Sequence, residues 1–215
     1  RVDMIPSHLK EAWIKWFREH EQEPIFSDAQ HGKGIEDIRK AAQNAGVAMN
    51  QRRRDRGMLP RPVRAVVIGF PNVGKSALIN RLLNSARRAG VTRQLRWVRI
   101  SDEIELLDAP GVLPNKLLDQ QAAIKLAICD DIGEAAYDNQ RVAASFVDLL
   151  KELGTEQPLT ERYGVSAADM TGESYLKAIA AHKYQEDAER AARQLLTDFR
   201  KGILGAIALE RPPID

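Results

Sequence analysis

The chain has 215 residues, of which 44% are hydrophobic and 29% are charged, with a formal net charge of +2. This composition is typical of a globular protein with one or two domains, and no apolar run approaches the length that a membrane span needs, so we expect no membrane partner. The single cysteine, Cys129, excludes a disulfide framework and favours a reducing compartment.

The first predicted helix begins near Ser7, which we expect to act as its cap. Its apolar residues recur on one face: Leu9, Ala12, Trp13, Trp16 and Phe17. Core packing is the interpretation that we prefer for both tryptophans.

A short strand is predicted over 24–26, followed by the loop 27–30. A second amphipathic helix follows, and we expect Gly46 to end it. Its apolar positions are Ile35, Ile38, Ala42 and Ala45.

An arginine-rich stretch, NQRRRDRGMLPRPVR, comes next, and we interpret it as a linker. The clustered arginines are Arg52, Arg53, Arg54, Arg56 and Arg61. They form either a solvated turn or a strip that contacts RNA phosphates, and the sequence leaves both alternatives open.

The most specific motif lies in VVIGFPNVGKSALINRLL. Gly69, Gly74, Lys75 and Ser76 match G-x-x-x-x-G-K-[ST], in which backbone N–H groups cradle phosphates, the lysine reaches the β- and γ-phosphates, and the serine ligates Mg²⁺. A buried parallel strand is predicted over 65–68 and a helix after the loop, the order that directs a helix N-terminus at an anion. The nucleotide-binding residues expected here are Asn72, Val73, Gly74, Lys75, Ser76 and Ala77.

A second phosphate element follows the strand predicted over 104–107. Asp108 and Gly111 match D-x-x-G, in which the aspartate holds Mg²⁺ through water and the glycine N–H meets the γ-phosphate. Thr92 lies between the two motifs and is a candidate ligand of Mg²⁺ and the γ-phosphate, the alternative being a surface hydroxyl before a strand. We therefore expect a catalytic group of Lys75, Thr92 and Gly111, and a Mg²⁺ site of Ser76, Thr92 and Asp108.

A GTPase normally reads guanine with N-K-x-D, and nothing after Asp108 fits that pattern. The stretch NKLLD, Asn115 to Asp119, has one residue too many between lysine and aspartate, so we interpret it as a loop and helix start. The beginning of the chain fits better, because RVDMIP looks like N-K-x-D without its asparagine. Arg1 then stands at the lysine position, and Asp3 is the guanine-reading carboxylate.

Ser27 and Ala29 resemble the S-A-K loop, whose alanine N–H donates to guanine O6, with Gln30 in place of the usual lysine. Both base-reading pieces precede the phosphate loop. The domain is therefore predicted to be circularly permuted, which is acceptable because the termini of compact domains often lie close together.

This order of motifs, followed by a helical tail, resembles the circularly permuted ribosome-assembly GTPases of the YlqF/RbgA family. The specific stretches are GFPNVGKSALIN, GVTRQLRW, LLDAPGVL, ERYG and AARQLLTDFRKGILGAIALERPP. The resemblance implies an α/β fold: a Ras-like, circularly permuted P-loop GTPase domain over 1–115 and an all-helical RNA- and ribosome-binding domain over 116–215. It also implies GTP or GDP with Mg²⁺, and the large ribosomal subunit and its rRNA as partners. Asn72 resembles a residue that holds a K⁺ ion beside the phosphates, the alternative being a plain turn-forming asparagine.

Two further expectations concern the pocket. Val112 stands where Ras-like enzymes place a glutamine that orients the attacking water, so we expect slow hydrolysis alone and activation by the ribosomal particle. A Ras-like sheet also needs two strands between the 24–26 strand and the phosphate-loop strand, so we expect a strand, a helix and a strand upstream of Arg1. We expect a monomer in a bacterial cytoplasm or in a chloroplast or mitochondrial matrix.

Four helical segments are predicted in the tail: Leu117 to Asp131, Asn139 to Leu153, a capped piece near Ser166, and Gln185 to about Leu209. Two other functions stay open. A P-loop ATPase or small-molecule kinase is one, which Asp3 and Ala29 argue against. An RNA-binding module that does not turn over its nucleotide is the other, which Val112 and the arginines favour.

Overall fold

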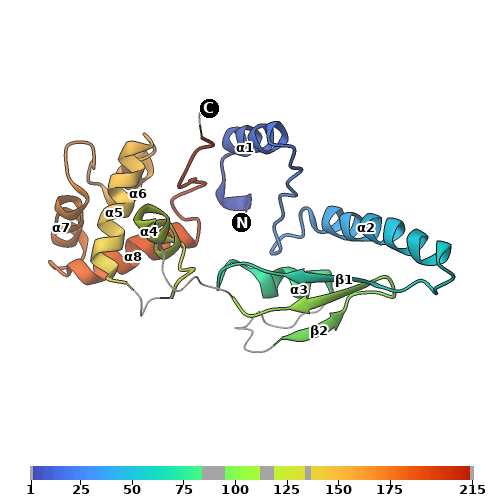
Figure 1. Ribbon diagram of the computed structural model, residues 1–215. Coiled ribbons are helices and arrows are strands. Elements are labelled where there is room, and N and C mark those ends of the chain that lie inside the picture. The colour runs from blue at the N-terminus through green and yellow to red at the C-terminus, as the bar shows by residue number, and fades with distance from the viewer. Residues whose placement is uncertain (1, 84–94, 112–118, 134–136, 214–215) are drawn as a thin grey trace. The chain divides into compact units, whose positions relative to one another are not determined.

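The computed structural model describes residues 2–83, 95–111, 119–133 and 137–213 (Figure 1). Its contacts divide the chain into two units. The first consists of Arg1–Val2 and Glu23–Leu113, and the second of Asp3–Gln22 and Pro114–Asp215. The break after Leu113 lies near the predicted boundary, whereas the grouping of Asp3–Gln22 differs from it, and the division at 115 stays a proposal.

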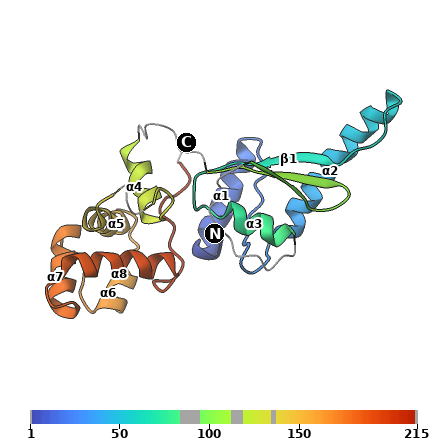
Figure 2. The same ribbon diagram turned by 90° about the horizontal axis from the view of Figure 1, so that it is seen from below.

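The described part of the first unit contains a three-stranded sheet in the order β1-β3-β2. Strand β1 (Val63–Val67) runs parallel to β3 (Ile104–Asp108), and β2 (Arg96–Arg99) runs antiparallel to β3. Alternate residues of the strands face a core that α2 (Ile35–Asp55) and α3 (Lys75–Leu82) complete (Figures 1 and 2). The sheet thereby brings the carboxyl ends of β1 and β3 together.

Strand β1 is half-buried on one face and exposed on the other, which corrects the prediction of a fully buried strand. Ala65 and Val67 pack against the core, whereas Val66 and Ile68 are 53% and 73% exposed. The upstream strands expected before the chain stay a prediction.

The prediction of a strand over 24–26 is wrong, because these residues are not part of the hydrogen-bonded sheet. Pro24 has no N–H to donate, and Ile25 is exposed rather than paired. The extended pairing comes later, as a single bridge between Asp28 and Lys33. A β-favouring sequence forms a strand only where a neighbouring strand accepts its hydrogen bonds.

The prediction that Gly46 ends the second helix is wrong. Helix α2 continues to Asp55, and Gly46 is buried inside it. A Cβ at this position would lie 2.4 Å from Cγ2 of Val63, so the glycine lets α2 pass close to the start of β1. The stretch predicted as a linker is therefore partly the end of this helix.

The second unit is helical. Its helices are α1 (Ser7–Glu19), α4 (Gln120–Ile128), α5 (Asn139–Glu152), α6 (Gln157–Tyr163), α7 (Gly172–Lys183) and α8 (Ala188–Arg200) (Figure 1). The core lies where α5, α7 and α8 meet, with the rings of Phe146 and Phe199 at 4.8 Å. No helix among the described residues is both long and apolar enough to cross a bilayer.

Helix boundaries differ from prediction where caps decide them. Helix α8 ends at Arg200 rather than near Leu209, because Gly202 takes φ 74° and its N–H donates to Phe199 O. Helix α7 is capped by Thr171, not Ser166. Pro6 rather than Ser7 occupies the N-cap position of α1, and no side chain caps this helix.

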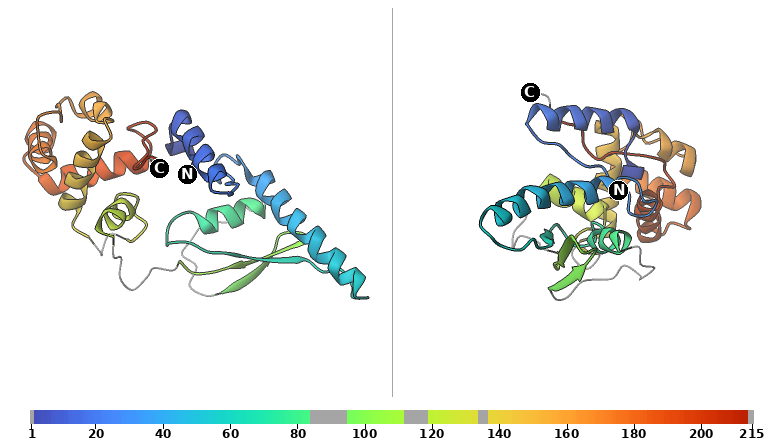
Figure 3. Two further views of the ribbon diagram at one scale, coloured as in Figure 1. Left: turned by 45° about the horizontal axis from the view of Figure 1, so that its top comes forward. Right: turned by 90° about the vertical axis from the view of Figure 1, so that its right-hand side faces the viewer.

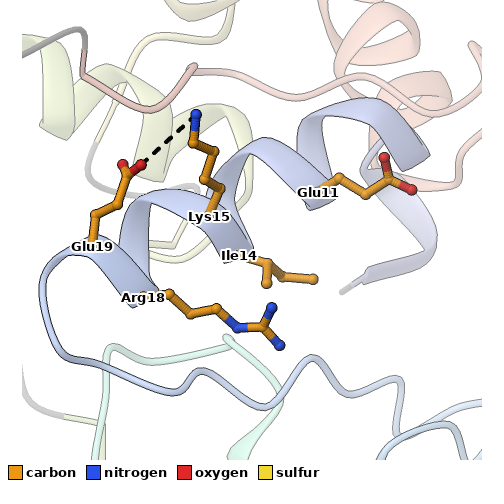
Figure 4. A pocket seen from close by; sticks show the side chains of 5 residues that line it. All are labelled: Glu11, Ile14, Lys15, Arg18 and Glu19. Atoms are coloured by element: carbon orange, nitrogen blue, oxygen red, sulfur yellow. Dashed lines mark ion pairs between the residues drawn. The ribbon is translucent and has the colours of Figure 1, made fainter.

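The tryptophans of α1 are half-buried rather than core residues. Trp13 and Trp16 pack edge to face at 5.7 Å, and Trp16 packs on Phe17 at 5.2 Å. No residue of α1 is fully buried. A separate surface pocket is lined by charged side chains of the same helix, including Lys15, which pairs with Glu19 at 3.7 Å (Figure 4).

The ERYG stretch has a structural role in this unit. Asp198 of α8 is fully buried and accepts hydrogen bonds from Arg162 Nε at 2.7 Å, Tyr163 OH at 3.0 Å and Gln194 Nε2 at 2.6 Å. Burial, with the nearby Asp198 charge, raises the pKa of the Tyr163 hydroxyl far above its usual value, so the phenol stays a donor. Gly164 then ends α6 in a left-handed conformation.

Candidate functional site

The phosphate loop joins β1 to α3 and is shaped by residues with positive φ. Gly69 has φ 151°, Asn72 has φ 58° and Gly74 has φ 99°, so the chain turns tightly before α3 begins at Lys75. Asparagine tolerates the left-handed region better than most residues, which suits Asn72 to its place. These turns let the loop curl over the N-terminus of α3, where backbone N–H groups lack helical acceptors.

Lys75 closes the loop from its inner side. Its Nζ donates to the backbone oxygens of Gly69 at 3.0 Å and Phe70 at 2.6 Å. Ser76 follows in the first turn of α3. The ammonium and the hydroxyl are thus held at the helix N-terminus, where the helix dipole favours an anion.

The D-x-x-G segment lies directly against this loop. In the parallel ladder Asp108 pairs with Val67, the last residue of β1, and the Asp108 side chain is buried. A Cβ on Gly111 would lie 2.5 Å from Cα and 2.6 Å from N of Pro71. The structure therefore brings Lys75, Ser76, Asp108 and Gly111 to one edge of the sheet.

Replacing Gly111 with alanine is expected to weaken GDP and GTP binding about 5- to 150-fold, because the added methyl group displaces Pro71 and overpacking costs about 1–3 kcal/mol. Titration with a fluorescent guanine nucleotide measures this loss. Asp102→Ala is the control, since Asp102 is exposed in the same unit and forms a surface ion pair with Arg99. Equal affinity of Gly111→Ala and the parent chain would contradict the close packing of the two loops.

The 27–30 loop is organised by Asp28, a residue with no predicted role. The Asp28 carboxylate accepts the N–H groups of Gln30 at 2.9 Å and His31 at 3.2 Å, and His31 Nδ1–H at 2.5 Å. Burial alone would raise the pKa of Asp28, but these hydrogen bonds outweigh it and leave that pKa below its usual value. A carboxylate that accepts N–H groups two and three residues further on forms an Asx turn. An aspartate near the start of a loop is the sequence signal for such a turn.

This loop also reaches the helix that follows the phosphate loop. A Cβ on Gly32 would lie 2.4 Å from an Arg81 guanidinium nitrogen, so Arg81 of α3 packs directly on the loop. Ser27 and Ala29 are half-buried beside Asp28. The predicted base-reading loop and the phosphate loop therefore belong to one unit and are linked through α3.

Four predicted residues lie outside the described part of the first unit. Asp3 is exposed in the 3₁₀ turn Val2–Met4 and belongs to the second unit. Arg1, Thr92 and Val112 lie outside the described residues. Their assigned roles stay predictions.

The oxygen donors at this edge suit a Mg²⁺ ion that also binds water and phosphate, rather than a metal ion held by protein side chains alone. Among the described residues, no group of three or more His, Cys, Asp or Glu side chains gathers. Mg²⁺ in phosphate sites usually takes few protein oxygens and completes its shell with water and substrate phosphates. The Ser76 hydroxyl and the Asp108 carboxylate fit that pattern.

Comparison with known proteins agrees with this geometry. A family model described as 50S ribosome-binding GTPase matches residues 64–158. Ribosome biogenesis GTPase A of Bacillus cereus is 31% identical over 99% of this chain and 75% of its own length, and that of Priestia megaterium is 31% identical over 92% and 74%.

Two solved structures show the same fold. A GDP-bound structure of YlqF matches with a TM-score of 0.65 and 19% identity, covering 99% of this chain and 81% of its own. A GNP-bound structure of YlqF from T. maritima gives 0.62 and 20%, covering 99% and 79%. The predicted fold, a permuted P-loop GTPase domain with a helical C-terminal part, is confirmed. The phosphate loop and the D-x-x-G segment are in contact, as Gly111 and Pro71 show. Because relatives named ribosome biogenesis GTPase A match this chain over nearly its whole length, the chain belongs to the ribosome biogenesis GTPase A family.

Proposed function

We propose that this GTPase works in assembly of the large ribosomal subunit, and that its nucleotide state controls its docking to that particle. The observation that carries the proposal is the meeting of Lys75, Ser76, Asp108 and Gly111 at one edge of the sheet. Family membership supplies the kind of particle, because the relatives are named for ribosome biogenesis and the family model for 50S binding.

The residues at this edge have separate roles in the proposal. Lys75 binds the β- and γ-phosphates, together with the N–H groups of residues 73–77, and the Gly111 N–H binds the γ-phosphate. Ser76, Asp108 and Thr92 hold Mg²⁺, which neutralises charge that develops on the phosphates. Asn72 holds a K⁺ ion beside them.

Guanine recognition is assigned to Asp3, Ser27 and Ala29. A carboxylate pairs with the two N–H donors on the guanine edge, and a backbone N–H at Ala29 donates to O6. Adenine instead presents an N–H donor at position 6, an acceptor at N1 and no donor at position 2. This assignment distinguishes the proposal from a P-loop ATPase.

Replacing Asp3 with asparagine is expected to lower GDP affinity at least about tenfold, because a carboxylate that accepts two N–H groups is lost, and to relax the preference over ADP. Parallel titrations with GDP and ADP measure both changes. Asp102→Asn provides a matched change on the exposed surface of the first unit. If Asp3→Asn keeps the parent's ratio of GDP to ADP affinity, Asp3 does not read the base.

Hydrolysis by the chain alone is proposed to be slow. Val112 follows the D-x-x-G segment and its side chain has no group that can hydrogen-bond a water. The ribosomal particle would supply or position the missing group, and hydrolysis would then release the factor.

Contact with rRNA is proposed for the helical domain, residues 116–215. Exposed basic side chains of α8, such as Arg190 and Arg193, would supply the phosphate contacts. We further propose a monomer that acts in the bacterial cytoplasm or in the corresponding organelle compartment.

Co-sedimentation with purified large ribosomal subunits tests the proposal. The chain loaded with a non-hydrolysable GTP analogue is expected to pellet with the subunits, and the GDP-loaded chain to stay mostly in the supernatant. Equal pelleting in both nucleotide states would contradict nucleotide-controlled docking.

A further inference from the structure

The end of helix α2 carries a positive surface that the nucleotide site does not use. We call residues 50–61 the arginine tip. It contains five arginines, one aspartate and no lysine, a net charge of +4 in a chain whose total is only +2. Arg52, Arg54, Arg56 and Arg61 are exposed, and Arg53 is half-buried.

The tip projects past the core of the first unit. Gly46 is the position at which α2 touches the start of β1, and the helix continues for nine more residues, about 14 Å at 1.5 Å per residue. Figures 1 and 3 show this end of α2 extending beyond the strands before the chain turns back to β1. Val47 is 64% exposed there, so core packing does not account for this part of the helix.

The turn that follows the helix is nonetheless ordered by hydrogen bonds. Asn50 Nδ2 donates to Arg61 O, and Arg61 N–H donates to Asn50 Oδ1, both at 3.0 Å. Arg53 Nε donates to Leu59 O at 2.8 Å, and Gly57 takes φ 70°. The arginines are therefore presented from a defined backbone, which lowers the entropy lost when they bind a ligand.

Their charges are not neutralised within the described part of the chain. None of the five arginines forms an ion pair with a carboxylate there, and the one acidic residue, Asp55, accepts a hydrogen bond from Gln51 at 2.9 Å. A helix C-terminus favours a basic residue or two through its dipole. Five arginines are more than the helix dipole accounts for, so the cluster indicates an anionic partner.

Arginine content favours RNA over an anionic membrane. A guanidinium binds a phosphate through two parallel N–H groups and is weakly hydrated, whereas lysine serves equally well near lipid headgroups. Membrane attachment also needs a broad apolar helix face, and the tip offers only Leu59 and Met58, at 83% and 39% exposure. The phosphates of a folded RNA helix match this surface, because A-form RNA is recognised largely by its shape and backbone.

We propose that the arginine tip is a second RNA-binding surface, located on the GTPase unit and contacting the phosphate backbone of helical RNA. The proposal rests on the proposed function, in which a ribosomal particle is the partner. Strand β1 runs from the tip to the phosphate loop, about 17 Å over its five residues, so RNA at the tip leaves the nucleotide loop accessible.

The test uses the full chain and a labelled RNA duplex about 16 base pairs long, titrated over a series of KCl concentrations. The variant is Arg52→Gln/Arg56→Gln/Arg61→Gln. Its control, Lys15→Gln/Lys40→Gln/Arg99→Gln, removes the same charge from scattered exposed positions. The tip variant is expected to lose at least about tenfold in RNA affinity, and its salt slope to fall by about two to three, while the control stays near the parent.

Equal loss in both variants, or no loss in either, would overturn the proposal. Binding of phosphatidylserine vesicles that the tip variant abolishes, with RNA affinity unchanged, would overturn it in favour of a membrane. GDP affinity is measured on the same preparations. Failure of the parent chain to bind GDP would overturn the proposed function, whereas intact GDP binding with unchanged RNA binding would overturn only the role of the tip.

Discussion

Replacing Lys75 with alanine is expected to lower the affinity for GDP and GTP by at least about 100-fold, or about 2.8 kcal/mol. Lys75 Nζ lies at the phosphate loop, held by the carbonyl groups of Gly69 and Phe70. Alanine removes both the charge and the donors that reach the phosphates, and each charge-assisted hydrogen bond contributes about 1.5–3 kcal/mol. Titration with a fluorescent GDP analogue measures the loss.

Lys40→Ala is the matched control for this result, because Lys40 is an exposed lysine of α2 in the same unit. It is expected to bind GDP like the parent chain. The melting temperature of Lys75→Ala should also stay close to that of the parent, since no core contact is removed. Unchanged GDP affinity in Lys75→Ala would refute the assignment of the phosphate loop.

Replacing Asp198 with alanine is expected to destabilise the helical unit by about 3–5 kcal/mol. The carboxylate is fully buried and is the acceptor for Arg162, Tyr163 and Gln194. Its removal leaves these donors without their acceptor and opens a cavity between α6 and α8. Urea denaturation followed by helical circular dichroism measures the free energy of unfolding.

Two further variants separate charge from packing. Asp198→Asn keeps the volume and is expected to lose less than Asp198→Ala. Asp102→Ala removes a carboxylate that is exposed, and it should leave the unfolding curve unchanged. A stability of Asp198→Ala equal to that of the parent would show that the ERYG stretch does not anchor α8.

The sequence predicted best those features that are set by local chemistry. The phosphate loop, the D-x-x-G strand end and α5 follow from glycine positions, apolar spacing and caps, and Asp138 caps α5 as expected of its type. Features that depend on distant partners were predicted poorly. A glycine such as Gly46 is typical of a helix end, but here it is required by the close approach of Val63. The 24–26 segment has the composition of a strand, but the described sheet offers it no partner strand.

The candidate site divides in the same way. The meeting of Lys75, Ser76, Asp108 and Gly111 could be predicted, because each motif fixes its own residues and parallel strands bring their carboxyl ends together. The anchoring of the predicted base-reading loop could not be predicted. It depends on Asp28 binding its own turn and on Arg81 packing against Gly32, a contact between residues 49 positions apart.

Phosphate release from GTP tests the central claim most directly. It is measured in potassium buffer, with and without purified large ribosomal subunits, on the parent chain and on Lys75→Ala. The account predicts slow release by the parent chain alone, strong stimulation by the subunits, and no stimulation for Lys75→Ala. Tight GDP binding without any stimulation by the subunits would contradict activation by the ribosomal particle.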